Sequence, residues 1–150
     1  MLYLEDLKLG DRFMSREYEM TLDEIQQFAH TYDPQIFHTD EVQAKDHLVF
    51  KGIAASGWHT AAVTMRLWTE CFPVAHGLIG SESAIRWPRP TRPNDRIHVE
   101  VEIIAITPSK TKNDRAIVSY ITQTLNQNKD VLLISTTKIV VFKKELSAVE

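Results

Sequence analysis

The chain has 150 residues, of which 43% are hydrophobic and 25% charged, so one folded domain with its own core is expected and a disordered or low-complexity chain is not. The net charge of −3, from 17 Lys and Arg against 20 Asp and Glu, argues against a general nucleic-acid binder. A single cysteine, Cys71, excludes a disulfide framework and a multi-thiolate metal site within one chain.

The sequence shows no targeting or membrane-spanning pattern. Its apolar runs are far shorter than the ~20 residues that a spanning helix needs. Residues 1–13 lack a basic flank followed by an apolar block, which is the pattern of a secretory signal. A cytoplasmic location is therefore expected, with neither a membrane nor a nucleic acid as partner.

The first strong helix signal follows an entry segment and a strand over residues 1–20. Thr21 and Glu24 form a capping-box pattern, and apolar residues then recur on one helical face. The helix should stop before Pro34, because the residue ahead of a proline avoids the helical region.

Two further helices are expected before residue 73. Residues 33–57 read as mostly loop, with one short helix over 40–45 that Thr39 caps. Apolar residues then lie almost all round the segment 58–72. A helix that is apolar on most faces is a buried helix, so this segment is predicted to be the central one.

The second half of the chain changes to a period of two. Strands are predicted over residues 81–87, 97–103, 115–125 and 131–142, with a turn at 126–130 between the last two. Helices early and strands late favour an α+β fold with an antiparallel sheet. The buried helix requires that this sheet curl around it.

An acid and an imidazole stand five residues apart after the first helix. A loop could turn Asp33 and His38 onto one point, where the pair could activate a water and return a proton near neutral pH. On these residues alone an ordinary role is the commoner explanation. In that case Asp33 ends the helix and His38 packs or hydrogen-bonds locally.

Two other segments could serve a ligand. Small residues over 53–57, ahead of the buried helix, would expose backbone amides to a carbonyl oxygen that gains negative charge. Four arginines within residues 86–96 could meet phosphates. Each segment also has an ordinary explanation, because Ser56 or Gly57 could merely cap the helix and the arginines could be solvated on a proline-stiffened connection.

These three segments, in this order, resemble the MaoC-like or (R)-specific enoyl-CoA hydratase family of the hot-dog fold. The family motif of an aspartate, a histidine five residues on, an acid or proline and a small residue is matched by Asp33, His38, Asp40 and Ala44. Residues 53–58 resemble the family segment that opens its central helix, and residues 86–95 resemble its strand and Pro-rich turn. The resemblance covers most of the chain.

The resemblance implies one MaoC-like hot-dog domain over residues 1–150, with a curved antiparallel sheet wrapped around a long central helix, and a homodimer. The implied reaction is reversible hydration of a trans-2-enoyl thioester to an (R)-3-hydroxyacyl thioester. Asp33 would act as the base and His38 as the orienting or proton-transferring partner, while the backbone amide of Gly57 would stabilise the enolate-like oxygen. The residues assigned to substrate binding are Ser56, Trp58, Arg86, Arg89 and Arg92.

The substrate would be a thioester of coenzyme A or of acyl carrier protein, and the reaction is expected to need no metal and no other cofactor. Three positions depart from the usual Asp-x-Asn-Pro-x-His pattern of the family. Pro34 follows the aspartate directly, Gln35 stands where Asn is usual, and Ile36 stands where the proline is usual. The spacing from acid to histidine is kept.

Two alternatives stay open. An acyl-CoA thioesterase would use a carboxylate near the start of the central helix, but no Asp or Glu lies between Ser56 and Thr69. A non-catalytic acyl-thioester-binding protein would use the same fold with its carboxylate turned into a cap. Convergence of Asp33 and His38 on one water-sized space would favour the hydratase.

Overall fold

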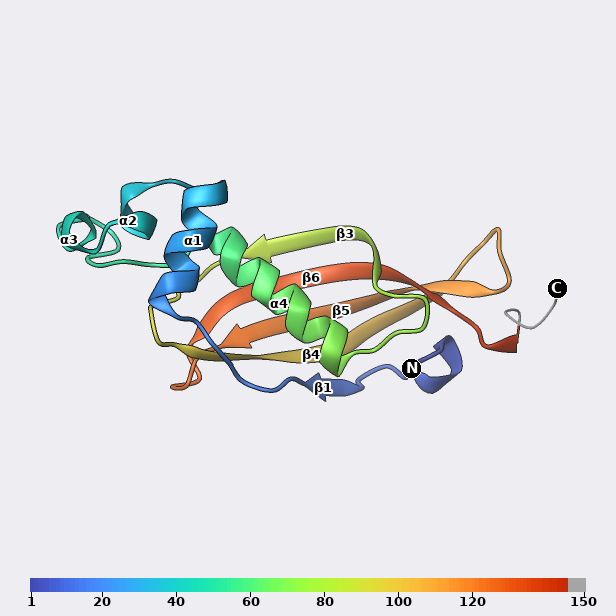
Figure 1. The fold of residues 1–150 in the computed structure, drawn as a ribbon. Helices are drawn as coiled ribbons and strands as arrows, with labels where there is room; N and C mark the ends of the chain where they lie inside the picture. The colour runs from blue at the N-terminus through green and yellow to red at the C-terminus, as the bar shows by residue number, and fades with distance from the viewer. Residues whose placement is uncertain (146–150) are drawn as a thin grey trace.

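The computed structural model describes residues 1–145 and shows a six-stranded antiparallel sheet crossed by one long helix (Figure 1). The strands are β1 (Arg12–Met14), β2 (Tyr18–Glu19), β3 (Ile79–Arg86), β4 (Arg96–Pro108), β5 (Arg115–Leu125) and β6 (Val131–Phe142). The helices are α1 (Leu22–Tyr32), α2 (Ile36–Thr39), α3 (Glu41–Ala44) and α4 (Gly57–Cys71). This architecture confirms the predicted α+β class.

The sheet has the strand order β1-β4-β5-β6-β3, and β2 pairs with β4 beside β1. Every neighbouring pair is antiparallel, and the long strands β4, β5 and β6 form its body. The turn between β5 and β6 is closed by a hydrogen bond from Asn126 N–H to the Asp130 carbonyl at 3.0 Å. The predicted bounds of β5, β6 and their turn are therefore confirmed, whereas β4 runs five residues beyond its predicted end at residue 103.

The concave face of the sheet packs against α4 and forms the core. Alternate residues of β4, β5 and β6 are buried there, because successive side chains of a strand point to opposite faces. From α4, Val63 and Leu67 pack into this layer. The buried core residues of the three strands include Val99, Val101, Ile103, Val118, Tyr120, Ile139 and Val141.

A row of buried polar contacts joins α4 to the rest of the molecule. Three side chains spaced four residues apart on one face of the helix each meet a threonine hydroxyl. The contacts are Thr60 with Thr91 at 2.8 Å, Thr64 with Thr124 at 2.7 Å, and Trp68 Nε1 donating to Thr122 at 2.8 Å. These bonds are directional, so they fix how α4 is rotated against the sheet.

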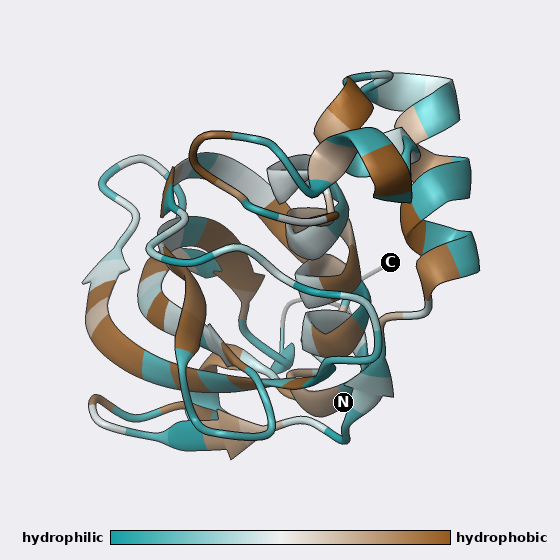
Figure 2. Cartoon of the chain, turned by 90° about the vertical axis from the view of Figure 1, so that its left-hand side faces the viewer, coloured by the Kyte–Doolittle hydropathy of each residue, from teal (hydrophilic) through white to brown (hydrophobic). Residues whose placement is uncertain are grey.

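The sheet covers only one side of α4, as the end-on view in Figure 2 shows. Trp58 is 62% exposed and Met65 39% exposed, and Arg66 and Glu70 also face away from the core. The prediction of a helix buried on most faces is therefore corrected to a helix with one uncovered side. Within residues 1–145, no helix combines the length and the apolar character that crossing a membrane requires.

The segment between α1 and α4 differs from the sequence prediction. Residues 36–39 form the short helix α2 instead of loop. Helix α3 is capped by Asp40, whose carboxylate accepts from Val42 N–H at 2.9 Å and Gln43 N–H at 3.0 Å, and not by Thr39. An aspartate is among the best capping residues and carries the charge that a helix N-terminus favours.

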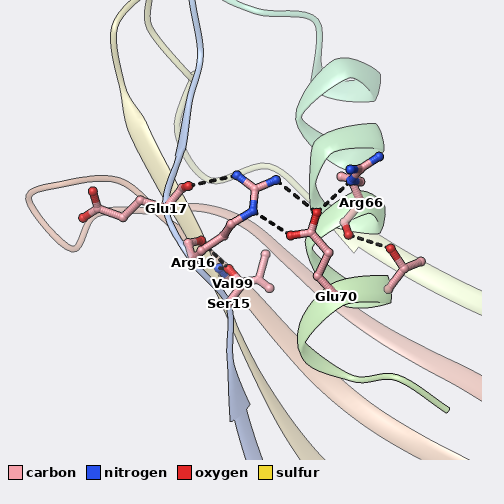
Figure 3. A network of polar contacts seen from close by, with 7 residues as sticks. Ser15, Arg16, Glu17, Arg66, Glu70 and Val99 are labelled. Carbon is pink, nitrogen blue, oxygen red and sulfur yellow. Dashed lines mark hydrogen bonds and ion pairs between the residues drawn. The ribbon is translucent and has the colours of Figure 1, made fainter. Parts of the chain in front are cut away.

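A surface ion-pair network ties the link between β1 and β2 to the last turns of α4 (Figure 3). Arg16 binds both carboxylate oxygens of Glu70, from Nε at 2.7 Å and Nη2 at 3.0 Å, and Arg66 Nε adds a third contact at 2.7 Å. Hydrogen bonds from Arg16 and Arg66 lower the pKa of Glu70 from 4.5 to about 2.

Replacing Glu70 with Gln should lower the free energy of unfolding near neutral pH, because the amide loses its charge-assisted contacts. A lowered pKa stabilises the fold above 4.5, and this stabilisation is lost as pH falls from 4.5 toward about 2. Urea unfolding of both proteins, near neutral pH and again below pH 4.5, measures the difference. The difference in unfolding free energy between the two proteins should be smaller below pH 4.5 than near neutral pH. An unchanged difference would contradict the assignment of the lowered pKa to Glu70.

Candidate active site

The predicted acid and imidazole meet where α1 ends. Asp33 terminates that helix, with its backbone N–H donating to the Ala29 carbonyl at 2.8 Å. The chain turns at Pro34 and enters α2, whose third residue is His38. This brings His38 Nε2 to 3.1 Å from Asp33 Oδ2, with only 4% of His38 exposed. The sequence placed His38 in a loop, whereas it stands on a one-turn helix.

The other ring nitrogen of His38 has a partner of fixed polarity. Nδ1 lies 2.6 Å from the Ala54 carbonyl oxygen, which can only accept, so we assign a hydrogen to Nδ1. Nε2 is then the nitrogen that faces the Asp33 carboxylate, 3.1 Å away. A ring protonated on both nitrogens donates to both neighbours, whereas a ring without the Nε2 proton offers a lone pair to a water.

The carboxylate of Asp33 is set up as a proton acceptor. Gln35 Nε2 donates to its Oδ1 at 2.6 Å. Burial raises the pKa of Asp33, but the Ser56 hydroxyl, the Gln35 amide and His38 together lower it by more, so that pKa lies below its ordinary value of 3.8. Asp33 is therefore ionised at neutral pH. Gln35, which departs from the usual family pattern, supplies one of the stabilising bonds.

Ser56 contributes a buried hydroxyl that has bonding capacity left. The residue is fully buried at the N-terminus of α4, and its side chain does not cap the helix. Its Oγ lies near enough to Asp33 to lower that pKa, yet it makes no hydrogen bond of full geometry with any of residues 1–145. A buried hydroxyl in this state is costly unless a water or a ligand meets it.

The first turn of α4 places a backbone donor beside these groups. Gly57 N–H has no acceptor within residues 1–145, as expected for the first residue of a helix. The Trp87 indole lies against Gly57 and donates from Nε1 to its carbonyl at 2.8 Å. A Cβ on Gly57 would lie 2.9 Å from Trp87 Cε2. Only glycine leaves the indole in place at this position.

One cleft of about 540 Å³, a volume within the range of small-molecule sites, is lined by Asp33, Gln35, His38, Gly57 and Trp87, whereas the fully buried Ser56 is not part of its lining. The buried Thr60–Thr91 hydroxyl pair lies at its inner end, and Trp58 and Trp87 meet edge to face near its mouth, with ring centroids 5.1 Å apart. A hollow of about 340 Å³ elsewhere is lined by Arg12 and Glu102, which pair with each other, and by no histidine. The perturbed acid and the imidazole identify the first cleft as the candidate site.

The structure separates the residues assigned to substrate binding. Trp58 and Arg89 line the cleft, and Ser56 lies beside Asp33. Among the described residues the Arg89 side chain makes a single long contact, 3.4 Å from Nη1 to the Val131 carbonyl, so most of its donors are unused there. Arg86 ends β3 outside the lining of the cleft.

Arg92 also lies outside that lining, and its guanidinium is occupied. Its Nη1 donates to the carbonyls of Gly52 and Ile53 at 3.1 Å each, and its Nη2 donates to the carbonyl of Phe50. The side chain therefore binds the backbone that leads into Ala54. Its availability for a phosphate is correspondingly reduced.

Sequence reasoning missed two contributors to the site. The Ala54 carbonyl carries no signal, because any residue supplies the same backbone oxygen. Trp87 lies 30 residues from Gly57, and only the folded chain brings them together. The small residues before α4 did indicate a close approach, although its partner was unknown.

Metal ligation has no visible basis in the described part of the chain. Among residues 1–145, no three His, Cys, Asp or Glu side chains come together as a metal ion would need.

Comparison with known proteins gives a consistent result. A family model described as MaoC like domain matches residues 8–124. The uncharacterized protein YdeM of Bacillus subtilis (strain 168) is 30% identical over 146 residues, which cover 96% of this chain and 95% of YdeM. The crystal structure of the MaoC-like dehydratase from Rhodospirillum rubrum is 51% identical, with a TM-score of 0.93 over 96% of this chain and 99% of that one.

A more distant likeness extends to an (R)-hydratase. The (R)-hydratase from A. caviae involved in PHA biosynthesis is 19% identical, with a TM-score of 0.75 over 92% of this chain and 98% of its own. At that identity the likeness is one of fold. Together with the R. rubrum structure it confirms the predicted hot-dog fold.

Substituting Gly57 with Ala should displace the Trp87 ring, because the new Cβ would overlap it. The expected cost is about 1 kcal/mol of unfolding free energy, at the low end for overpacking because the ring is partly exposed. Chemical denaturation measures this cost, with Gly80→Ala as the control, since a Cβ there meets no atom within 4 Å. The cost should shrink when Trp87 is also replaced by Leu, and an undiminished cost would refute the contact.

Proposed function

Because this chain belongs to the MaoC-like domain family, we propose that it is a hydratase, and in reverse a dehydratase, of acyl thioesters. It adds water to a trans-2-enoyl thioester and forms an (R)-3-hydroxyacyl thioester. One observation carries the proposal. The Asp33 carboxylate and His38 Nε2 lie 3.1 Å apart in a cleft that Gly57 also lines, and the N–H of Gly57 has no acceptor within residues 1–145.

The proposed steps conserve atoms and protons. Asp33 accepts a proton from the bound water as the water oxygen attacks the β-carbon. His38, protonated on both nitrogens, delivers its Nε2 proton to the α-carbon. The proton on Asp33 then passes to Nε2 across the 3.1 Å contact, which restores the starting state. Groups of this kind contribute about 10²–10⁴-fold each to a rate.

The thioester oxygen gains charge as the nucleophile attacks. Gly57 N–H is the donor we assign to it, since this amide has no acceptor of its own and stands at the positive end of α4. Such a donor is worth about 10²–10³-fold in rate. The Ser56 hydroxyl, buried next to Asp33, is assigned to the water or the thioester. We infer that no metal or other cofactor takes part.

The substrate proposed is a thioester of coenzyme A or of acyl carrier protein. Both carriers hold the acyl group on a phosphate-bearing arm, and guanidinium groups bind phosphate well. Arg89 lines the cleft with free donors, which favours it as the phosphate contact. Arg86 has no polar side-chain partner within residues 1–145, so it could assist from the end of β3.

One observation keeps thioester hydrolysis as a second candidate. No acid lies on the first turns of α4, yet Asp33 reaches the same place from α1 and interacts with Ser56. A carboxylate there could direct water at the thioester carbon instead of the β-carbon. The two reactions differ in their products, because only hydrolysis releases a free thiol.

We further propose that the chain forms a homodimer through the edge of its sheet. Strand β3 pairs only with β6, and seven of its eight residues are exposed. A free edge of this length is normally paired or protected. Pairing of β3 with β3 of a second copy would satisfy its backbone groups.

Wild-type protein should hydrate crotonyl-CoA, followed as loss of the enoyl thioester absorbance without release of thiol. Asp33→Asn and His38→Ala should each lower kcat about 10²–10⁴-fold, because each removes one proton-transfer group. Asp33 titrates below its ordinary 3.8, so its protonation should not limit the rate above that pH. Asp46→Asn and His30→Ala, which change exposed residues, are the matched controls.

Three results would refute this assignment. Thiol release at the rate of absorbance loss would favour the thioesterase. Undiminished activity of both site variants would move the chemistry elsewhere. A wild-type protein that binds crotonyl-CoA and a longer enoyl-CoA without converting either would indicate a binding protein.

Light scattering should give about twice the chain mass of 17.2 kDa, because the free β3 edge pairs between copies. Hydrogen exchange at β3 amides should slow as protein concentration rises, since pairing protects them. A mass of one chain at micromolar concentration, with exchange that does not depend on concentration, would contradict the dimer.

A further inference from the structure

Arg92 is a charged side chain that the proposed reaction does not use. It precedes β4 and is half-buried. Its guanidinium donates to three backbone carbonyls, those of Phe50, Gly52 and Ile53. Within residues 1–145 its guanidinium contacts no carboxylate, and only its backbone N–H donates to one, that of Asp95 at 2.8 Å. The Arg92 guanidinium is therefore bonded to carbonyl oxygens.

The segment that Arg92 binds has an unfavourable backbone conformation. Lys51 has φ of 50° and Gly52 has φ of 152°, so two consecutive residues lie in the region that side-chain-bearing residues rarely adopt. This backbone path directs the carbonyls of Phe50, Gly52 and Ile53 toward the Arg92 guanidinium. Such a conformation persists only where surrounding contacts hold it, and the planar guanidinium supplies three of them.

The next residues along the chain hold the catalytic imidazole. Ala54 N–H donates to the Phe37 carbonyl at 3.0 Å, and the Ala54 carbonyl accepts from His38 Nδ1 at 2.6 Å. Ala55 N–H donates to the Thr91 carbonyl at 2.9 Å, directly before Arg92. Arg92 and the carbonyl that orients His38 thus belong to one hydrogen-bonded frame.

We propose that Arg92 is a positioning residue for His38. By holding the carbonyls of residues 50, 52 and 53, it fixes the Ala54 carbonyl against Nδ1 and so keeps Nε2 directed at Asp33. This inference rests on the proposed function only for its kinetic effect. It separates Arg92 from Arg89, whose donors remain free for a phosphate in the cleft.

The kinetic test compares Arg92→Lys and Arg92→Gln with wild type on crotonyl-CoA. A single ammonium cannot satisfy three carbonyls, so both variants should lose kcat about tenfold to hundredfold, as misplacement of a catalytic group does. KM should stay within about threefold, because uniform binding is unchanged. Arg89→Ala should show the reverse, a raised KM that depends on salt.

A raised KM with unchanged kcat in the Arg92 variants would identify a phosphate ligand and overturn the proposal. Arg96→Ala is the matched control, since Arg96 is an exposed arginine nearby that pairs with Glu17 on the surface. Addition of guanidinium chloride at non-denaturing concentration should restore part of the kcat of Arg92→Ala. Sodium chloride at the same concentration should not, and equal effects of the two salts would also overturn the proposal.

A spectroscopic readout tests the inference apart from activity. The Nδ1 proton of His38, in a hydrogen bond of 2.6 Å, should give a strongly downfield NMR resonance that His38→Ala abolishes. In Arg92→Lys and Arg92→Gln this resonance should move upfield or broaden. An unmoved resonance would overturn the positioning role. If wild type proves inactive on enoyl thioesters, the proposed function fails while this measurement still decides the role of Arg92.

Discussion

The hydrogen bond from His38 Nδ1 to the Ala54 carbonyl fixes the orientation of the imidazole, on which the geometry of the Asp33–His38 pair depends. Because the carbonyl can only accept, the bond assigns one ring nitrogen as a donor and leaves the other facing the Asp33 carboxylate at 3.1 Å. Ala54 also bonds back to Phe37, the residue before the histidine. The ring and its acceptor are therefore held to each other from both sides, and the imidazole orientation does not depend on a loop alone.

Helix α4 connects the site to the sheet and to the ion pairs around Glu70. Its first residue supplies the free N–H beside the acid, while Glu70 near its other end is bound by two arginines. Between these ends the helix packs on the concave face of the sheet. A site built on a helix that is fixed along its length is more precise than one built on loops, which suits a reaction that depends on proton transfer over about one hydrogen-bond length.

The sequence predicted those features whose signal is local or periodic. Strands β5 and β6 were expected over the residues that form them, because runs rich in apolar and β-branched residues on either side of a turn segment are typical of strands. Asp33 and His38 were recognised by their spacing in a family motif. Helix α2 was missed, because four residues are too few to show helical periodicity.

Other contributions to the site cannot be recognised from the amino-acid sequence, because they depend on tertiary contacts. An arginine that binds phosphate and one that binds backbone carbonyls look the same in a sequence, so Arg92 could be placed only by the fold. The same holds for the Trp87 ring against Gly57, which joins positions 30 residues apart. Tertiary contact decides such roles, and the sequence indicated only that small residues were needed near α4.

The threonine contacts along α4 have a consequence for how this sequence can vary. Removing one hydroxyl of the buried pair Thr60–Thr91 leaves its partner unsatisfied, whereas replacing both by valine keeps the shape and leaves nothing unpaired. In the pair Thr64–Thr124 only Thr124 would be left unsatisfied, because Thr64 also donates to the Thr60 carbonyl at 2.8 Å. We therefore expect divergent relatives to carry either two hydroxyls or two apolar residues at positions 60 and 91. Mixed pairs would be the rare, destabilised intermediates between those two solutions.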